Sequence, residues 1–220
     1  EYLLENVLIP WLQDRVKFPA IILSLTLRTA GISESLLDEK IAEFMALSNP
    51  TVGLAAHSGH VDIRITAKAA NKSAATEVIA PLETEIRRRV GDWIFGIDNE
   101  TLEGIIVRHL AEHNFSLALA EINTGGMLYS QLERAASALE SPHVIEIETI
   151  QNFLDVSSMA SHIEGEADQI RARASTNYAA CAAIQVHSDG SQHIAIAVTD
   201  GILRKPKISS WATERSDAGT

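Results

Sequence analysis

The 220-residue sequence predicts two units in succession, a small α+β domain followed by an α/β/α domain with a mixed sheet. In the first half, stretches of alternating apolar and polar residues are interleaved with two helical stretches, in the order β-α-β-β-α-β. In the second half, helices alternate with strands until two strands pair across a turn at 188–191. Such an order is typical of a mixed sheet with helices on both faces.

The first half begins with a helical stretch and changes to a strand pattern at Ile21. Residues 1–16 place apolar side chains at helical spacing, interrupted by Pro10. After the strand that begins at Ile21, a capped helix is expected to start at Ser35 and to end before Pro50. The other elements expected in this half are strands at 51–56 and 61–67, a helix at 73–90 and a closing strand at 94–96.

The second half opens with a helix whose capped start lies at 98–101. The inner face of this helix is expected to consist of Leu102, Ile105, Ile106 and Leu110. The pattern then changes between strands and helices several times before the end of the sequence. The expected elements are a strand at 115–120, a helix at 127–139, a strand at 144–147, a helix at 156–174, strands at 178–186 and 193–199, and a last strand at 208–211.

Composition limits the classes of partner. The net charge of −11 repels phosphate backbones, so no nucleic-acid partner is expected. No apolar run reaches the roughly 20 residues that span a bilayer, so no membrane partner is expected either. Cys181, the single cysteine, excludes an intrachain disulfide and suits a cytoplasmic location. Its apolar neighbours indicate a small buried side chain and not a reactive thiol.

The most informative segment is 117–126, which reads Leu-Ala-Leu-Ala-Glu-Ile-Asn-Thr-Gly-Gly. It predicts an apolar strand, a sharp turn and a glycine pair that opens a helix, a layout that points backbone N–H groups at an anionic ligand. The alternative is that these residues only form the strand-to-helix turn, and the sequence leaves both interpretations open. The candidate ligand-binding residues are Glu121, Asn123, Thr124, Gly125 and Gly126.

This segment resembles the Ala-Glu-Ser-Cys-Thr-Gly-Gly signature of the CinA family, competence/damage-inducible proteins with a nicotinamide-nucleotide amidohydrolase domain. Four segments of the first half also resemble the middle, KH-like domain of that family, and they occur in the family's order. These segments are Gly31–Lys40, Asn49–Val52, Val61–Lys68 and Gly91–Gly96.

The resemblance implies a KH-like α+β domain at 20–96 and a CinA C-terminal-like α/β/α domain at 97–220, without the family's last helix. It implies that 1–19 form the exit segment of an upstream molybdopterin-binding-like domain. It also implies a homodimer. RNA binding is not expected, because the first half has no Gly-x-x-Gly loop of the kind that true KH modules use.

The family's amidohydrolase activity, hydrolysis of the carboxamide of nicotinamide mononucleotide, requires residues that this sequence does not keep. The position of the nucleophilic serine is Ile122, and that of the neighbouring cysteine is Asn123. No lysine occurs between Lys72 and Lys205, and no Thr-Gly-x-x-Gly-Pro loop follows the strand at 178–186. Neither Ser116 nor Ser130 is expected to replace the nucleophile.

The sequence therefore predicts a CinA-like protein whose amidohydrolase-like domain has lost catalysis and serves assembly, regulation or weak nucleotide or anion binding. No catalytic residue, cofactor or metal is assigned. The alternative is an active nicotinamide-nucleotide amidohydrolase that uses residues other than those of the family.

Two histidine patterns mimic metal sites. The segment 57–62, His-Ser-Gly-His-Val-Asp, places two imidazoles and a carboxylate close together, but an exposed hairpin tip is the preferred interpretation. His109 and His113 have i,i+4 spacing without an evident third ligand, which is typical of a solvated helix face.

Overall fold

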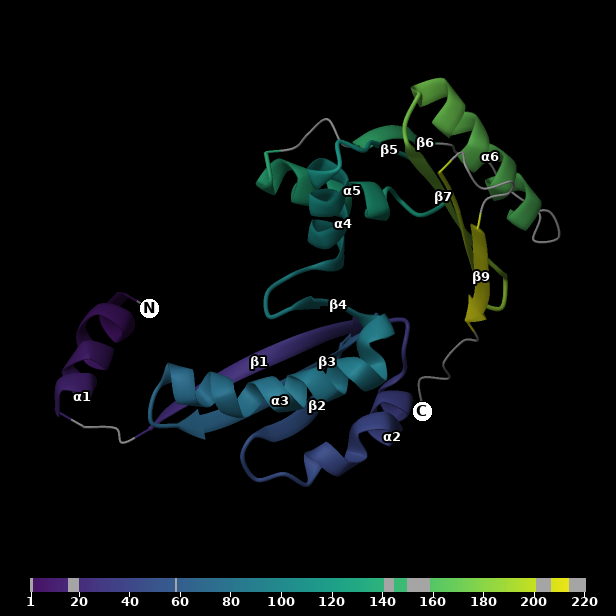
Figure 1. Ribbon diagram of the computed structural model, residues 1–220. Coiled ribbons are helices and arrows are strands. Elements are labelled where there is room, and N and C mark those ends of the chain that lie inside the picture. The colour runs from purple at the N-terminus through teal and green to yellow at the C-terminus, as the bar shows by residue number, and fades with distance from the viewer. Residues whose placement is uncertain are drawn as a thin grey trace. The chain divides into compact units, whose positions relative to one another are not determined.

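The computed structural model describes residues 2–15, 20–57, 59–140, 145–149, 159–200 and 207–213 (Figure 1). The chain divides into two compact units, Glu1–Thr101 and Leu102–Thr220. Among the described residues, no helix has the length and apolar character that crossing a membrane requires.

The first unit has the β-α-β-β-α-β order that the sequence predicts, preceded by a helical stretch. That stretch consists of a π-helical turn at Leu4–Leu8 and of α1 (Ile9–Arg15). The other elements are β1 (Ile21–Ala30), α2 (Glu34–Met45), β2 (Thr51–His57), β3 (His60–Ala69), α3 (Lys72–Val90), a 3₁₀ turn at Gly91–Trp93 and β4 (Ile94–Ile97).

The four strands form an antiparallel sheet in the order β2-β3-β1-β4, and α2 and α3 cover one of its faces. The core lies between these helices and the sheet, and Ile63 and Ile65 of β3 are fully buried in it. Because side chains alternate along a strand, Asp62 lies on the opposite face. The predicted α+β fold of the first unit is confirmed.

The start of α2 differs from the prediction by two residues. Ser33, and not Ser35, is the N-cap: its backbone is extended and its hydroxyl accepts a hydrogen bond of 3.3 Å from the backbone N–H of Leu36. A serine side chain can satisfy a free N–H of the first turn only from this position. Asn71 caps α3 in the same way, with 2.9 Å from its Oδ1 to the backbone nitrogen of Ala74.

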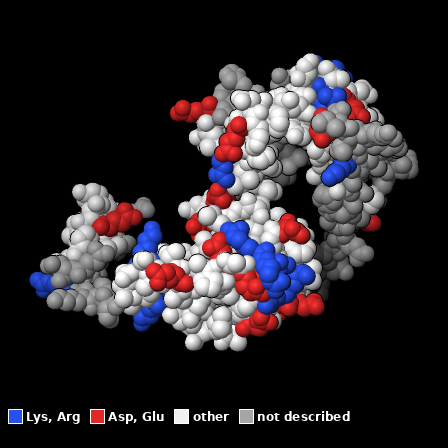
Figure 2. All heavy atoms as spheres, viewed as in Figure 1, with Lys and Arg blue, Asp and Glu red and all other residues white. Residues whose placement is uncertain are grey.

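The basic run at the end of α3 is surrounded by acidic side chains. Arg88 and Arg89 both pair with Glu85, at 2.7 and 2.8 Å, and Arg89 also reaches Glu43 of α2 at 2.6 Å. Figure 2 shows basic and acidic side chains next to one another on the visible face of this unit. Arg87 pairs separately with Glu83 at 2.8 Å. All three arginines of residues 87–89 thus have acidic partners on the helix surface, and such ion pairs contribute little to stability.

The second unit alternates helices and strands and ends in two antiparallel strand pairings. Its elements are α4 (Leu102–Glu112), β5 (Leu117–Ile122), α5 (Met127–Ala138), β6 (Ile145–Thr149), α6 (Met159–Ala174), β7 (Tyr178–Val186), β8 (Gln192–Thr199) and β9 (Lys207–Thr213). Part of the predicted helix at 156–174, its first three residues, lies outside the described residues, as does residue 144.

The five strands form one mixed sheet in the order β6-β5-β7-β8-β9. The strands β6, β5 and β7 are parallel, whereas β8 is antiparallel to both of its neighbours. One apolar cluster joins the sheet to α6, and a second joins its other face to α4 and α5. The mixed sheet with helices on both faces confirms the predicted class.

Two details of the second unit differ from the prediction. The predicted inner face of α4 is wrong at Leu102 and Ile106, which are 45% and 39% exposed, because Val107 and Leu110 are the residues that meet the sheet. The predicted strand at 115–120 lies two residues further on. Its last residues are consequently Glu121 and Ile122.

Candidate functional site

The segment 117–126 forms the end of β5 and the turn that leads into α5. Three residues of this turn have positive φ, namely Asn123 (58°), Gly125 (70°) and Gly126 (73°). Glycine adopts such angles without a steric penalty, and asparagine tolerates them better than most residues do. The five candidate ligand-binding residues therefore lie together at one strand-to-helix turn, as the sequence suggests.

Glu121 satisfies the free N–H groups at the start of α5. The side chain is 2% exposed, and its carboxylate accepts hydrogen bonds from the backbone N–H of Tyr129 at 2.7 Å and of Leu128 at 3.3 Å. The hydroxyl of Thr124 donates to the same carboxylate. Backbone N–H groups of a first helical turn have no partner within the helix, and a negative charge there is favourable. Glu121 thus takes the place that an anionic ligand would take at these two donors.

The remaining polar contacts of the turn are also internal. The hydroxyl oxygen of Thr124 accepts a hydrogen bond of 3.4 Å from the backbone N–H of Gly126. Asn123 and Gly125 are exposed at the surface of the turn. The described contacts among the five residues thus account for a local turn structure.

Ile122 lies in the core and not at the surface. It is 1% exposed and belongs to the apolar cluster between the sheet and α6, together with Met159 and Ile163 of that helix. Across the sheet it pairs with Ala183 of β7. The position that corresponds to the nucleophile of the CinA signature is therefore filled by an aliphatic side chain packed beneath α6.

Three other side chains with nucleophilic atoms, those of Cys181, Ser116 and Ser130, are no better placed. Cys181 is fully buried, and burial, with a smaller effect of Glu166, raises its pKa to about 12, so the thiol stays protonated. This agrees with the prediction of a buried, unreactive cysteine. The hydroxyl of Ser130 donates to the carbonyl of Met127 at 3.1 Å, and that of Ser116 donates to Asn177 at 3.3 Å. Neither serine occupies the position of Ile122.

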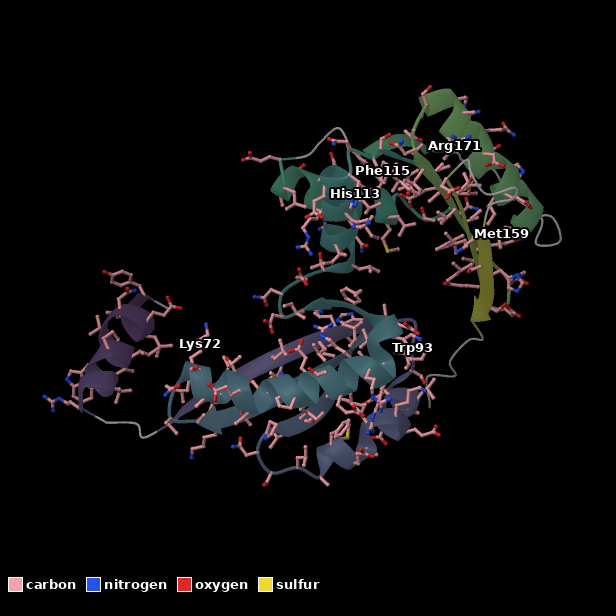
Figure 3. The ribbon with its side chains drawn as sticks, viewed as in Figure 1. Lys72, Trp93, His113, Phe115, Met159 and Arg171 are labelled. Carbon is pink, nitrogen blue, oxygen red and sulfur yellow. The ribbon has the colours of Figure 1, made fainter. Side chains whose placement is uncertain are left out.

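The second unit contains an open apolar cavity of about 520 Å³, which no pattern in the sequence predicts. Side chains of α4, α5, β5, β7 and β8 line it, including Ile106, Leu128 and Val198. At one end Phe115 lies beside His113 (Figure 3), with ring centroids 5.6 Å apart, and meets Tyr178 edge-on at 5.4 Å. The excess of apolar residues on α4 is a sequence signal for this cavity, although helical spacing by itself indicates a buried face.

The first unit matches a protein-family model described as "Damage-inducible protein CinA KH domain" over residues 24–96. The "Putative competence-damage inducible protein" of Moorella thermoacetica is 41% identical over 128 residues, which are 58% of this chain and 31% of the relative. A "CinA-like protein" of Synechococcus elongatus is 42% identical over 120 residues, 54% of this chain and 28% of the relative. Both alignments extend beyond the residues of the family model.

A solved structure, that of the competence/damage inducible protein CihA from Agrobacterium tumefaciens, is 14% identical and covers 53% of this chain and 81% of that chain. Its TM-score of 0.37 is too low to carry an argument.

The first unit is thus a KH domain of the type found in damage-inducible proteins. Over residues 24–96 the chain matches the KH domain of the CinA family, as its resemblance in sequence predicted, and it is similar to CinA-like proteins over 54–58% of its length. It corresponds to less than a third of the length of the curated relatives that it matches.

Proposed function

We propose that the second unit is an amidohydrolase-like domain that has lost catalysis and serves assembly of this CinA-like protein. The observation that carries the proposal is the burial of Ile122, which is 1% exposed. Amide hydrolysis requires a nucleophile, a base that activates it and donors that stabilise the oxyanion. An isoleucine beneath α6 supplies none of these functions, and a substrate cannot reach it.

Anion binding at the turn 121–126 has less support from the structure than assembly does. The carboxylate of Glu121 occupies the N–H groups of Leu128 and Tyr129, and its own charge repels a phosphate. The apolar cavity favours assembly instead, because exposed apolar surface of this kind marks interaction sites. The partner that we propose is a second copy of the chain, with α4 and β8 contributing Ile106 and Val198 to the contact.

The experiment that tests loss of catalysis is ammonia release from nicotinamide mononucleotide by the purified chain, beside an active CinA deamidase. We expect no release above background. Turnover that persists in a Thr124→Ala variant would favour the second candidate function, an active amidohydrolase with other residues. Turnover that requires Thr124 would place catalysis at the signature turn. Either form of turnover overturns the proposal.

Assembly is tested separately by sedimentation equilibrium. We expect a dimer for the original chain and a shift toward monomer for Ile106→Glu, because the new charge would have to be buried in an apolar contact. The matched control is Val186→Glu, which changes a valine that is 63% exposed and does not line the cavity. A monomeric original chain, or equal effects of the two variants, would contradict the role in assembly.

A further inference from the structure

The β2–β3 hairpin of the KH domain brings three potential metal ligands together. His57 is the last residue of β2 and pairs with His60, the first residue of β3, while Asp62 follows two residues later. Directly opposed cross-strand residues and residues at i,i+2 have side chains on the same sheet face. The three side chains thus lie on the face that α2 and α3 leave uncovered.

The potential ligand atoms lie close enough together to bind one metal ion, although the two shortest distances end on different oxygens of Asp62. His57 Nε2 lies 3.2 Å from Asp62 Oδ2, and His60 Nε2 lies 3.7 Å from Asp62 Oδ1. With metal–ligand bonds of 2.0–2.2 Å, neighbouring ligand atoms of a tetrahedral zinc site are about 3.4 Å apart. One ligand atom from each residue lies within 4.8 Å of the other two.

Asp62 is a second, independent indication of a ligand. Asp62 is only 7% exposed, and its charge is paired with Arg28, whose Nε lies 3.3 Å from Oδ1, but among the described residues, which leave out residue 58, this buried oxygen accepts no hydrogen bond. A buried carboxylate without full satisfaction is costly, and buried charges are normally paired or coordinate metals. The preferred interpretation of 57–62 as an exposed hairpin tip is therefore wrong for Asp62.

We propose that His57, His60 and Asp62 bind one divalent transition-metal ion of the zinc type, with a water molecule as fourth ligand. Two imidazoles and one carboxylate are a ligand set typical of zinc sites with an open position. Imidazole nitrogen disfavours Mg²⁺ and Ca²⁺, which prefer oxygen ligands. This site lies in the first unit and is independent of the function proposed for the second.

Arg28 of β1 competes with the metal ion in this arrangement. One of its terminal nitrogens lies 2.8 Å from His60 Nε2, and its Nε lies 3.3 Å from Asp62 Oδ1. Because a guanidinium can only donate, His60 Nε2 must accept, and that lone pair is the one a metal requires. In the metal-bound state Arg28 leaves His60 and stays on the carbonyl of Asp98 (3.2 Å), so that His60 Nε2 and a carboxylate oxygen of Asp62 are free to ligate.

The test is titration of the EDTA-treated chain with ZnCl₂ by calorimetry and with CoCl₂ by visible absorption, which reports tetrahedral geometry. The host chain carries His109→Ala and His113→Ala, since these residues and Glu112 form a second, exposed group of potential ligands, contrary to the expectation that a third ligand is missing there. We expect one ion per chain. The affinity should fall at least about tenfold in His57→Ala and in Asp62→Asn, as for the loss of other metal-site partners.

His57→Ala is the decisive variant, because the side chain of His57 is 47% exposed and its removal spares the fold, which circular dichroism checks. His187→Ala is the matched control, since it removes an imidazole from another hairpin. Arg28→Met should bind zinc more tightly. The absence of binding, equal affinity of His57→Ala and the host chain, or a loss confined to His187→Ala would overturn the site. Weaker binding by Arg28→Met would overturn the competition.

Discussion

Restoring the nucleophile of the family signature by Ile122→Ser should destabilise the second unit without creating activity. Ile122 is buried beneath α6 among apolar side chains, so the serine would face the core and not a substrate. The substitution Ile122→Ser therefore distinguishes between two interpretations of position 122. One view treats it as a damaged active site that a hydroxyl repairs, and the other as a position of the hydrophobic core.

The magnitude follows from the burial of the side chain. Replacing a fully buried isoleucine by alanine lowers the free energy of unfolding by about 2–5 kcal/mol, since methyl groups are lost and a cavity remains. A buried hydroxyl without a good partner adds about 1–3 kcal/mol. We therefore expect the free energy of unfolding of the second unit to fall by at least about 3 kcal/mol.

The assay is urea unfolding followed by the fluorescence of Trp211, the only tryptophan among residues 102–220. Trp11→Phe and Trp93→Phe remove the other two emitters, so the signal reports the second unit alone. Val186→Ser is the matched control, because this exposed valine should change stability by no more than about 0.5 kcal/mol.

A loss below about 1 kcal/mol for Ile122→Ser, the range of ordinary surface and semi-buried substitutions, would contradict a position in the hydrophobic core. Ammonia release from nicotinamide mononucleotide by this variant would be a stronger contradiction. It would mean that substrate reaches the end of β5 from the side that α6 covers.

Three further predictions concern other positions. Glu121→Gln should lower the free energy of unfolding of the second unit by about 1–2 kcal/mol and speed hydrogen exchange in the first turn of α5, because a charged helix cap is lost. Gly126→Ala should cost about 1 kcal/mol in the same urea assay, from its φ of 73° alone, since no atom lies within 4 Å of the added Cβ. Hydrogen bonds from Arg88 and Arg89 lower the pKa of Glu85 from 4.5 to about 2, so its stabilising contribution should persist above pH 4.5 and be lost as the pH falls toward 2. A carbon NMR titration of Glu85 checks this value, and an Arg88→Met, Arg89→Met variant should return it toward 4.5.

The hairpin of β7 and β8 was predictable almost to the residue, and the reason is local. Residues 188–191, Ser-Asp-Gly-Ser, specify a turn by themselves, with Gly190 at a φ of 85° and Asp189 accepting a hydrogen bond from the backbone N–H of Ser191. The strand at 192–199 then follows from its isoleucines and valine, whereas the strand at 178–186 contains four alanines and is located chiefly by the turn that follows it. Elements whose boundaries are set within a few residues are the ones that a single sequence can locate.

The inner face of α4 was less predictable because several apolar residues compete for it. Leu102, Ile105, Ile106, Val107 and Leu110 form an apolar stripe wider than the surface that the sheet offers. Helical periodicity gives the direction of such a stripe but not the edge at which contact ends. Some of the apolar side chains of α4 that the sheet does not cover, Ile106 among them, line an open cavity instead. Five elements form this cavity together, so the sequence of α4 alone does not reveal it.

The end of β5 shows why the candidate site was the hardest part. Glu121 indicated the end of a strand because glutamate is unfavourable in one, yet its partners are N–H groups seven and eight residues later. Capping of a helix from the preceding strand depends on how the two pack, and no local pattern in the sequence distinguishes it from an anion site. The same limit applies to 57–62, where the burial of Asp62 depends on the neighbouring strand β1.

The contacts of this turn also explain which signature residues the chain keeps. Glu121, Thr124 and Gly126 take part in the internal hydrogen bonds of the turn, and Gly125 has a φ of 70°. Within residues 120–126, the two residues that differ from the signature are Ile122 and Asn123. Neither takes part in the hydrogen bonds just described. Alternation along β5 directs the side chain at 122 toward α6 and the one at 121 toward α5. The capping of α5 therefore does not depend on the side chain at 122, and the fold is compatible with a core residue at the position of the signature's serine.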